Sequence, residues 1–339
     1  MKITINEVAI KAGVSTATVS RVLNGQIGYS EKTKEKVLKA IKELNYSPNA
    51  MARSLASNTT STIGVLVPYI PTSIASTILY GLETVAGDKG YSVIISNTGQ
   101  DGERTTKSLD LMSEKRVDGI IIISEPIKEE YYEILKNMKI PSVLVSTMSN
   151  EYLMPYVKVD DRAAAYSATQ FLIEAGHNKI AMISGYKDDL IAGTPRIEGY
   201  INAHKDYGIT IDDSLIKYGD FSYKSGVKCM EELISEGIAE EKNKFTAVFA
   251  ASDYMAVGAL KAAYINNIKV PEDISIIGYD NTEVSQMAIP SITVVAQPFE
   301  EMGRKASDNL IAMIEGKIKA ENSIMQHYLI ERESVKRLK

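Results

Sequence analysis

The segment VSTATVSRVLN, from Val14 to Asn24, carries side chains suited to contact with DNA bases. Small or hydroxyl residues and one arginine recur on the side of this segment opposite its valines; they are Thr16, Ala17, Ser20 and Arg21. An arginine can donate two hydrogen bonds to the edge of a guanine, and small neighbours allow close approach to base pairs. A solvated helix would usually carry long charged side chains there. We therefore predict that Ala17 and Arg21 read bases in a major groove.

Three short helices are expected to position these residues. Thr4 and Glu7 form a capping-box pattern before apolar residues at helical spacing, which are Ile5, Val8, Ala9 and Ala12. Gly13 then supplies a turn, and Ser15 can cap a second helix whose buried face is predicted to be Val19, Val22 and Leu23. Ser30 can cap a third helix, from Glu31 to about Leu44, with core positions Val37, Leu38, Ile41 and Leu44. The pattern predicts a helix-turn-helix domain over residues 1–46.

Charge is divided unevenly along the chain. Residues 1–60 hold nine Lys or Arg and four acidic residues, a net charge of +5, whereas the whole chain carries −5. The remaining residues therefore carry −10. A basic amino-terminal module joined to an acidic body is typical of a unit that contacts phosphates and is attached to a second function.

A second motif, NYSPNAMARSLAS from Asn45 to Ser57, follows the three helices. With VSTATVSRVLN, and with IGVLVP, VDGIIII, RIEGY, ASDYMAVG and IIGYDNTE further on, it resembles the LacI/GalR family of transcription regulators over essentially the whole length. The resemblance implies that Asn49 to Ala56, within a linker over 47–60, form a hinge helix that folds on DNA. It also implies that Leu55 enters the minor groove. Independently, this apolar helix is too short to be stable alone, so DNA or a partner must order it.

The expected DNA contacts come from the first two helices, the third-helix cap and the hinge. They are Thr4, Ile5, Asn6, Ser15, Thr16, Ala17, Thr18, Ser20, Arg21, Asn24, Ser30, Asn49, Ala52, Arg53, Leu55 and Ala56. Among these, the hydroxyl groups of Ser15, Thr18 and Ser30 are expected mainly to hold phosphates. The expected partner is double-stranded operator DNA with a pseudo-palindromic site, bound by a homodimer.

The rest of the chain, residues 61–339, predicts an α/β body of two doubly wound parallel sheets, resembling periplasmic binding proteins. Apolar runs alternate with helix-like stretches; the runs are IGVLVP, YSVIIS, GIIIIS and PSVLVS, then KIAMISG, TAVFAA, ISIIGY and ITVVAQ. We expect a first lobe from about 61–160 and 293–321, and a second lobe from about 161–290 and 322–339. A cleft at the carboxyl ends of both sheets would follow.

Polar and aromatic residues just after these strands are candidate effector ligands. They are Tyr69, Thr147, Arg196, Phe221, Ser252, Asp253, Asp280 and Gln297. The family resemblance adds that Arg196, Phe221, Asp280 and Gln297 match effector-contacting positions. Arg and Asp can hold vicinal hydroxyls and an aromatic ring can stack on a pyranose, so a sugar or sugar phosphate is expected. Asp253 as a helix cap and Phe221 as a core residue remain alternatives.

The sequence contains few motifs that indicate an enzyme. The three histidines are His177, His204 and His327, and the sequence has no GxSxG, phosphate loop, metal-spaced His/Cys cluster or dinucleotide fingerprint. We therefore expect no catalytic residue, metal or cofactor. His177 is expected near a helix end as a cap, Asp160 and Asp161 as caps of the next helix, and Cys229 as a small core residue.

Three other functions are alternatives to a ligand-controlled repressor. A solute-binding protein would have a signal peptide, and the charged amino-terminal stretch does not resemble one; with no bilayer-length apolar run, a cytoplasmic location is expected. A sugar-processing enzyme would need an acid/base pair. The catabolite-control branch of the family, whose corepressor is a Ser-phosphorylated phosphocarrier protein, remains the alternative within the regulator class.

Overall fold

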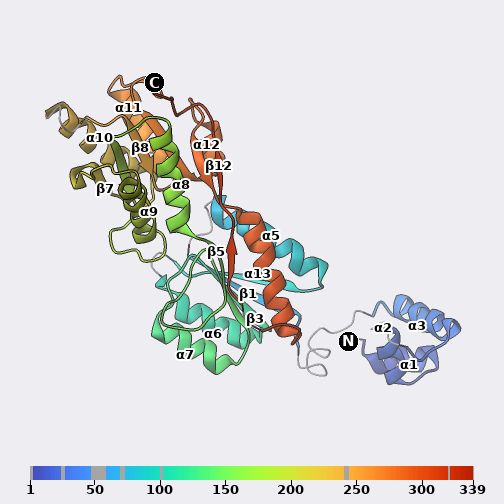
Figure 1. Cartoon of the computed structure of the whole chain (residues 1–339). Coiled ribbons are helices and arrows are strands. Elements are labelled where there is room, and N and C mark those ends of the chain that lie inside the picture. The colour runs from blue at the N-terminus through green and yellow to red at the C-terminus, as the bar shows by residue number, and fades with distance from the viewer. Residues whose placement is uncertain are drawn as a thin grey trace. The chain divides into compact units, whose positions relative to one another are not determined.

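The computed structural model describes residues 3–23, 27–46, 59–68, 73–99, 102–239, 244–319 and 321–338. The chain divides into two compact units, Met1–Ser61 and Thr62–Lys339. Figure 1 shows the helices and strands of each unit. Within the described ranges, no helix is long and apolar enough to cross a membrane.

The first unit is a three-helix domain. Its helices are α1 (Ile5–Ala12), α2 (Thr16–Leu23) and α3 (Glu31–Glu43). Their buried side chains form one small core, made of Val8, Ala9, Ala12, Val19, Val22, Val37 and Ala40. The helix-turn-helix order predicted from the sequence is confirmed.

One predicted core position of α3 is wrong. Leu38 is 49% exposed, and Ala40 is buried instead. The buried stripe of α3 consists of Val37 and Ala40 with Ile41 and Leu44 partly buried, which is the spacing of one helical face. Leu38 lies next to this stripe in sequence, but one residue turns the helix by about 100° and takes it off the face.

Lobe 1 of the second unit is built on a six-stranded, fully parallel sheet with the order β11-β5-β4-β3-β1-β2. The strands are β1 (Thr62–Val67), β2 (Ser92–Asn97), β3 (Gly119–Ile123), β4 (Ser142–Val145), β5 (Tyr156–Val159) and β11 (Ser323–Met325). Its helices are α5 (Ser73–Asp88), α6 (Thr105–Lys115), α7 (Glu129–Met138) and α13 (Phe299–Ile314). Two separate apolar clusters form, with α5 and α13 contributing to one and α6 and α7 to the other. Both faces of the sheet are therefore covered, as the continuous apolar strands predicted.

Lobe 2 repeats this plan with a sheet of order β12-β10-β9-β8-β6-β7. The strands are β6 (Ile180–Ser184), β7 (Ile216–Tyr218), β8 (Ala247–Ala250), β9 (Ser275–Asp280), β10 (Thr293–Ala296) and β12 (Tyr328–Ile330), which runs antiparallel to β10. The helices are α8 (Asp161–Glu174), α9 (Gly193–Asp206), η2 (Asp213–Leu215), α10 (Tyr223–Ala239), α11 (Asp253–Ile265) and α12 (Glu283–Met287). The predicted pair of doubly wound lobes is confirmed.

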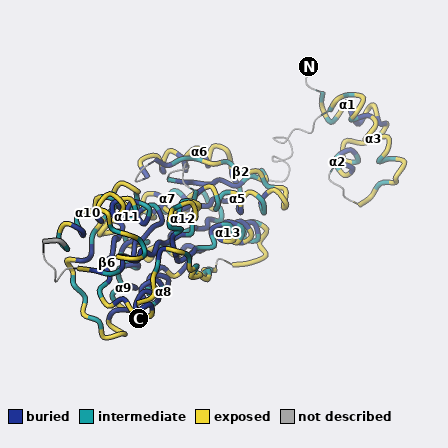
Figure 2. The backbone as a smooth tube through the Cα atoms, turned by 90° about the horizontal axis from the view of Figure 1, so that it is seen from above, coloured by how far each residue is buried: buried dark blue, intermediate teal, exposed yellow. Residues whose placement is uncertain are grey.

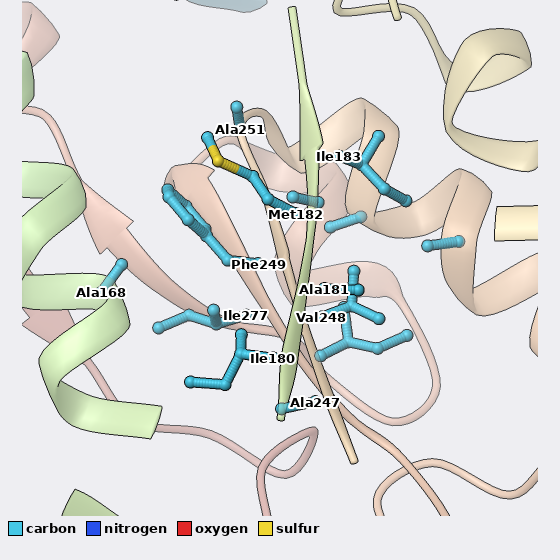
Figure 3. Close-up of a cluster of buried hydrophobic side chains, with 14 of the residues drawn as sticks. Ala168, Ile180, Ala181, Met182, Ile183, Ala247, Val248, Phe249, Ala251 and Ile277 are labelled. Carbon is cyan, nitrogen blue, oxygen red and sulfur yellow. The ribbon is translucent and has the colours of Figure 1, made fainter. Parts of the chain in front are cut away.

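The core of lobe 2 lies on both faces of its central strands. Figure 3 shows Met182 and Ile183, adjacent residues of β6, extending to opposite sides, with Phe249 of β8 beside Met182. All three are fully buried. Figure 2 shows the same division at the level of the chain, with buried strands inside and helices exposed on their outer sides.

The predicted return of residues 293–321 to the first lobe is wrong at its start. Thr293–Ala296 pairs with β9 and is a strand of lobe 2, so the chain crosses only after Ala296. The other predicted segment, 322–339, also begins in the wrong lobe, because Ser323–Met325 pairs with β5 in lobe 1. An apolar strand is equally compatible with either sheet, and only the hydrogen-bonded partner decides between them. The lobes are joined at three places, between β5 and α8, β10 and α13, and β11 and β12.

Candidate functional site

The exposed face of α2 holds the predicted base-reading residues. Val19 and Val22 are buried, whereas Thr16, Ala17 and Arg21 are exposed and Ser20 is half-buried. Within the described residues Arg21 forms no ion pair, and its guanidinium lies beside Gly28, where an added Cβ would sit 3.7 Å from Nη1. The positive φ of Gly28, 117°, suits glycine. This leaves one long cationic side chain among small neighbours on an exposed helix face.

The capping residues around α2 are also placed as the sequence predicted. The Glu7 carboxylate accepts hydrogen bonds from the Thr4 amide at 2.7 Å and from its hydroxyl at 2.9 Å. Ser15 Oγ accepts from the Thr18 amide at 3.2 Å and exchanges a hydrogen bond with the Thr18 hydroxyl at 2.9 Å. Ser30 caps α3 through the Thr33 amide, at 3.2 Å. These groups fix the helix starts, which lie at exposed positions.

Other predicted DNA contacts fall into two groups. Asn6 is exposed at the start of α1, while Ile5 is partly buried against the domain core. The remaining calls lie outside the described residues; they are Asn24, Asn49, Ala52, Arg53, Leu55 and Ala56, together with the effector candidate Tyr69.

In the second unit, five of the predicted effector residues lie at the carboxyl edge of the lobe 2 sheet; they are Arg196, Phe221, Ser252, Asp280 and Gln297. Arg196, on α9, is 6% exposed and its guanidinium lies 3.8 Å from the centre of the Tyr279 ring. Nε donates to Asp161 Oδ1 at 2.9 Å and Nη1 donates to the Ala251 carbonyl at 2.6 Å. Nη2 is 2.8 Å from the same Asp161 oxygen. Since a guanidinium has five N–H groups, these contacts leave two of them without a partner among the described residues.

Asp161 is the centre of a buried ionic network. Its second oxygen lies 2.9 Å from Lys158 Nζ, and Tyr279 donates its hydroxyl to Oδ1 at 3.0 Å. Burial raises the pKa of Asp161, but the charges of Arg196 and Lys158 outweigh burial and hold this pKa below its usual value. Lys158 also donates to the Ile191 carbonyl at 3.3 Å, on the loop that leads into α9. One carboxylate therefore positions two cations at this edge.

Phe221 and Ser252 complete one side of this cluster. The Phe221 ring centre is 5.7 Å from the Arg196 guanidinium carbon, and the Ser252 hydroxyl donates to the Phe221 carbonyl at 3.1 Å. Phe221 has a φ of 65°. Its ring packs on Gly185, just after β6, and a Cβ there would overlap the ring. Tyr186, 51% exposed, meets the Phe221 ring edge to face with centres 6.3 Å apart.

Asp280 and Gln297 form the other side. Gln297 Nε2 donates to Asp280 Oδ1 at 2.7 Å. Burial raises the pKa of Asp280 to about 6, against the opposing effects of Arg196 and Gln297. Gln297 also lines a hollow of about 610 Å³ shared with the first turns of α5 and α13, so it lies where the two lobes face each other.

Two predicted residues do not lie with this cluster. Asp253 has no exposed surface, and its Oδ2 accepts the Thr282 hydroxyl at 2.8 Å and the Thr282 amide. The cap of α11 is Ser252, which accepts from the Met255 amide. Thr147 is buried in lobe 1, where it donates to the Glu125 carbonyl at 3.1 Å. Asp253 therefore holds Thr282, two residues after Asp280, through hydrogen bonds. Thr147 belongs to lobe 1.

Several residues of the site were not predicted from the sequence. Asp160 does cap α8, through the Ala163 amide, but Asp161 was also interpreted as a cap and is instead the partner of Arg196. Lys158, Tyr186 and Tyr279 were not predicted at all. The available signal was that Lys158, Asp161 and Tyr279 interrupt otherwise apolar, buried segments, where charged or hydroxyl groups require partners.

Both units of the chain match known protein families. Residues 4–49 match the family described as bacterial regulatory proteins, lacI family, and residues 169–335 match a periplasmic binding protein-like domain. Catabolite control protein A of Priestia megaterium is 38% identical over 338 residues, covering 99% of this chain and 100% of that protein.

Two solved structures extend the likeness to the fold. The lac repressor dimer bound to operator and the anti-inducer ONPF is 29% identical with a TM-score of 0.87, covering 99% of this chain and 100% of that chain. A complex of the transcriptional regulator CelR with cellobiose is 33% identical with a TM-score of 0.75, covering 98% of this chain and 100% of that chain.

Proposed function

Because this chain belongs to the LacI family of bacterial regulatory proteins, DNA-binding repressors controlled by small ligands, we propose that its effector is a sugar bound beside Arg196 in lobe 2. The single observation that carries the proposal is the buried Arg196 guanidinium, held in place by Asp161 and by the Ala251 carbonyl, with N–H groups to spare. A fixed pair of donors suits vicinal hydroxyls.

The groups around Arg196 suit the two faces of a sugar ring. Asp280 and Gln297 supply acceptors and donors for hydroxyls, and they are already oriented by their mutual hydrogen bond. Phe221 and Tyr186 offer aromatic surface for the apolar face of a pyranose. The CelR complex holds cellobiose, which supports the sugar assignment by analogy.

On the DNA side, Arg21 and Ala17 read bases in the proposed complex, and Ser15, Thr18 and Ser30 approach phosphates. Their exposure, and the close spacing of small residues around Arg21, support this assignment. Operator binding requires two copies of the first unit at a fixed spacing, since a pseudo-palindromic site presents two half-sites. The proposed protein is therefore a homodimer.

The sugar site is tested with Gly185→Ala. The added Cβ overlaps the Phe221 ring and displaces it, so the variant should lose at least about tenfold in sugar affinity, or about 1.4 kcal/mol. Basal operator binding should stay unchanged. Titration calorimetry with a panel of sugars, and operator binding with and without the sugar found, would measure both.

Gly87→Ala is the matched control. Gly87 lies in α5 with no atom within 4 Å of an added Cβ, so its substitution should leave sugar affinity unaltered. A Gly185→Ala variant that responds to the sugar like the natural chain would remove Phe221 and its neighbourhood from the site. If operator binding responded only to a Ser-phosphorylated phosphocarrier protein, the catabolite-control alternative would replace the sugar.

A further inference from the structure

The turn that follows β9 has an unusual backbone. Asp280, the last residue of β9, has a φ of 110°, and the next residue, Asn281, has a φ of 66°. Among the described residues, this is the one place where two successive non-glycine residues both have positive φ. Asparagine tolerates the left-handed region, but an aspartate at 110° lies outside that region. The turn therefore needs contacts with the rest of lobe 2 to keep this conformation.

The two residues at positive φ are held by different partners. The Asp280 carboxylate accepts a hydrogen bond from the Gln297 side chain, and the Asp280 carbonyl accepts the Gln297 amide at 3.3 Å. Asn281 Oδ1 accepts a hydrogen bond from Arg332 Nη2 at 2.5 Å. Gln297 is also a proposed sugar contact, so its side chain can exchange Asp280 for the ligand. The Arg332 contact involves no proposed ligand group and can remain when sugar is bound.

Arg332 is itself fixed to lobe 2. Its Nη1 donates to the Ile292 carbonyl at 2.7 Å, and its backbone amide donates to the Thr293 hydroxyl at 2.9 Å. Two residues later, Ser334 donates its hydroxyl to the Ile276 carbonyl at 2.5 Å and accepts the Thr293 amide at 2.8 Å. Ile276 belongs to β9 and Thr293 to β10. The guanidinium therefore extends from a fixed segment, and its planar fork reaches the turn with the second terminal nitrogen.

We propose that Arg332 is a positioning residue of the sugar site, and that it keeps Asp280 in place by holding Asn281 at positive φ. One planar peptide unit joins these two residues of the turn, so a change of φ at Asn281 would redirect the backbone that carries Asp280. A turn that adopts the required conformation only part of the time binds its ligand more weakly in proportion. This inference rests on the proposed sugar site and adds a residue that acts through another.

The first measurement is the sugar affinity of Arg332→Gln in the full chain. Glucose, galactose, ribose and cellobiose are tested on the natural chain by calorimetry, and the sugar that binds is used throughout. Arg332→Gln should bind this sugar at least about tenfold more weakly, because a charged hydrogen bond to the turn is lost. Arg337→Gln is the matched control and should keep the natural affinity, since Arg337 lies in the same segment and forms an exposed pair with Glu331.

Substitutions of Asn281 test whether Arg332 acts on the backbone. Asn281→Ala and Asn281→Gly both remove the oxygen that Arg332 holds, but only glycine adopts positive φ without a steric cost. Asn281→Ala should therefore lose at least about fivefold in sugar affinity, and Asn281→Gly no more than about twofold. Adding Arg332→Gln to Asn281→Gly should cost at most about a further twofold, since the contact is already absent.

The outcomes separate this inference from the proposed function. Unaltered affinity of Arg332→Gln, or equal losses for Asn281→Ala and Asn281→Gly, would overturn the positioning role and leave the sugar site standing. A full tenfold loss from Arg332→Gln in the Asn281→Gly background would also overturn it, because Arg332 would then only tie the carboxyl-terminal segment to lobe 2. Failure of every sugar to bind the natural chain would overturn the proposed function and this inference with it. Thermal unfolding without sugar shows whether each variant folds, and the two Asn281 variants decide the outcome if Arg332→Gln does not.

Discussion

Substitution of Arg21 should weaken binding to operator DNA much more than binding to random DNA. Its side chain projects from the exposed face of α2 without an ion pair in the described residues. Arg21→Ala should cost roughly 1–3 kcal/mol on operator DNA and far less on random DNA, because a bidentate guanine contact is lost. Fluorescence anisotropy at one salt concentration would measure both affinities.

Lys39→Ala is the matched control for Arg21. Lys39 is exposed on α3, outside the predicted reading face, and pairs with Glu43 at 4.0 Å. Its loss should weaken both DNAs by a similar, small factor and lower the salt dependence of binding. Equal losses on operator and random DNA for Arg21→Ala would instead identify Arg21 as a phosphate contact.

Local residue patterns were predictable where the interaction spans three or four positions. The Thr4–Glu7 box and the Ser15, Ser30 and Asp160 caps are all present as expected, because their geometry depends only on the adjoining helix start. The pairing of Asp161 with Arg196 could not be predicted in this way. These residues are 35 positions apart, and only the packing of α8 on α9 brings them together.

At the scale of elements, the type and order of the helices and strands could be predicted from the sequence, but the neighbour of each strand in its sheet could not. Each of the eight predicted apolar runs forms a strand, because short runs rich in β-branched residues favour an extended chain. The lobe to which β10 belongs was wrong, because its sequence suits both sheets and its register against Ser275–Asp280 is a property of the assembled sheet. The predicted burial of Leu38 was wrong for a local reason, because Leu38 lies one position away from the buried face of α3.

The carboxyl-terminal segment adds an element with its own pH dependence. Residues 331–338 run along lobe 2, where the Leu338 amide donates to the Ala175 carbonyl at 2.7 Å. His177 joins this segment to the sheet: Nε2 is 3.0 Å from the Lys336 carbonyl and Nδ1 is 2.9 Å from the Thr246 hydroxyl. The carbonyl can only accept, so Nε2 carries a proton, and burial, which lowers the pKa of His177, favours the neutral ring. His177 therefore connects the carboxyl-terminal segment to Thr246 through hydrogen bonds. Its predicted role as a helix cap is wrong, because the C-cap of α8 is Ala175.

The contribution of His177 to the stability of lobe 2 should therefore be lost in acid. Burial lowers the pKa of His177 below 6.5, so the unfolded chain takes up a proton that the folded chain resists. The contribution is fully present above pH 6.5 and is lost as pH falls below it, at no more than about 1.4 kcal/mol per pH unit for one proton. Urea unfolding at pH 7.5 and 5.5 would measure the loss.

His177→Asn isolates this contribution from other titrating groups. Asp280 and Asp253 have raised pKa values and act in the opposite direction, so the natural chain alone gives only a sum. The variant is expected to be less stable at pH 7.5 but to lose less of its stability on going to pH 5.5. An identical pH dependence in the two proteins would show that His177 contributes nothing to it.

At the scale of the whole molecule, lobe 2 carries an exposed apolar face, and we propose that a second copy of the chain covers it. Ile289 is 92% exposed, Met287 68% and Tyr264 75%. Tyr264 and Ile289 line a hollow of about 620 Å³, whose other walls are largely apolar side chains of α11 and of residues 268–290. Exposed apolar surface of this kind is typical of protein interfaces. A pseudo-palindromic operator needs two three-helix domains held together by a dimer. Loss of contact at this apolar face should therefore weaken DNA binding through α2.

Ile289→Asp should therefore convert a dimer into a monomer and weaken operator binding by about 10²–10⁴, because the second half-site loses its high effective concentration. Sugar binding should persist, since the proposed ligand site lies within one chain. Leu153→Asp is the matched control: Leu153 is 98% exposed in lobe 1, so a charge there should change neither assembly nor DNA affinity. Sedimentation at micromolar concentration, for the full chain and for residues 62–339, gives the assembly state. A dimeric Ile289→Asp protein would place the interface elsewhere, and a monomeric one with undiminished operator affinity would remove dimerisation from the mechanism.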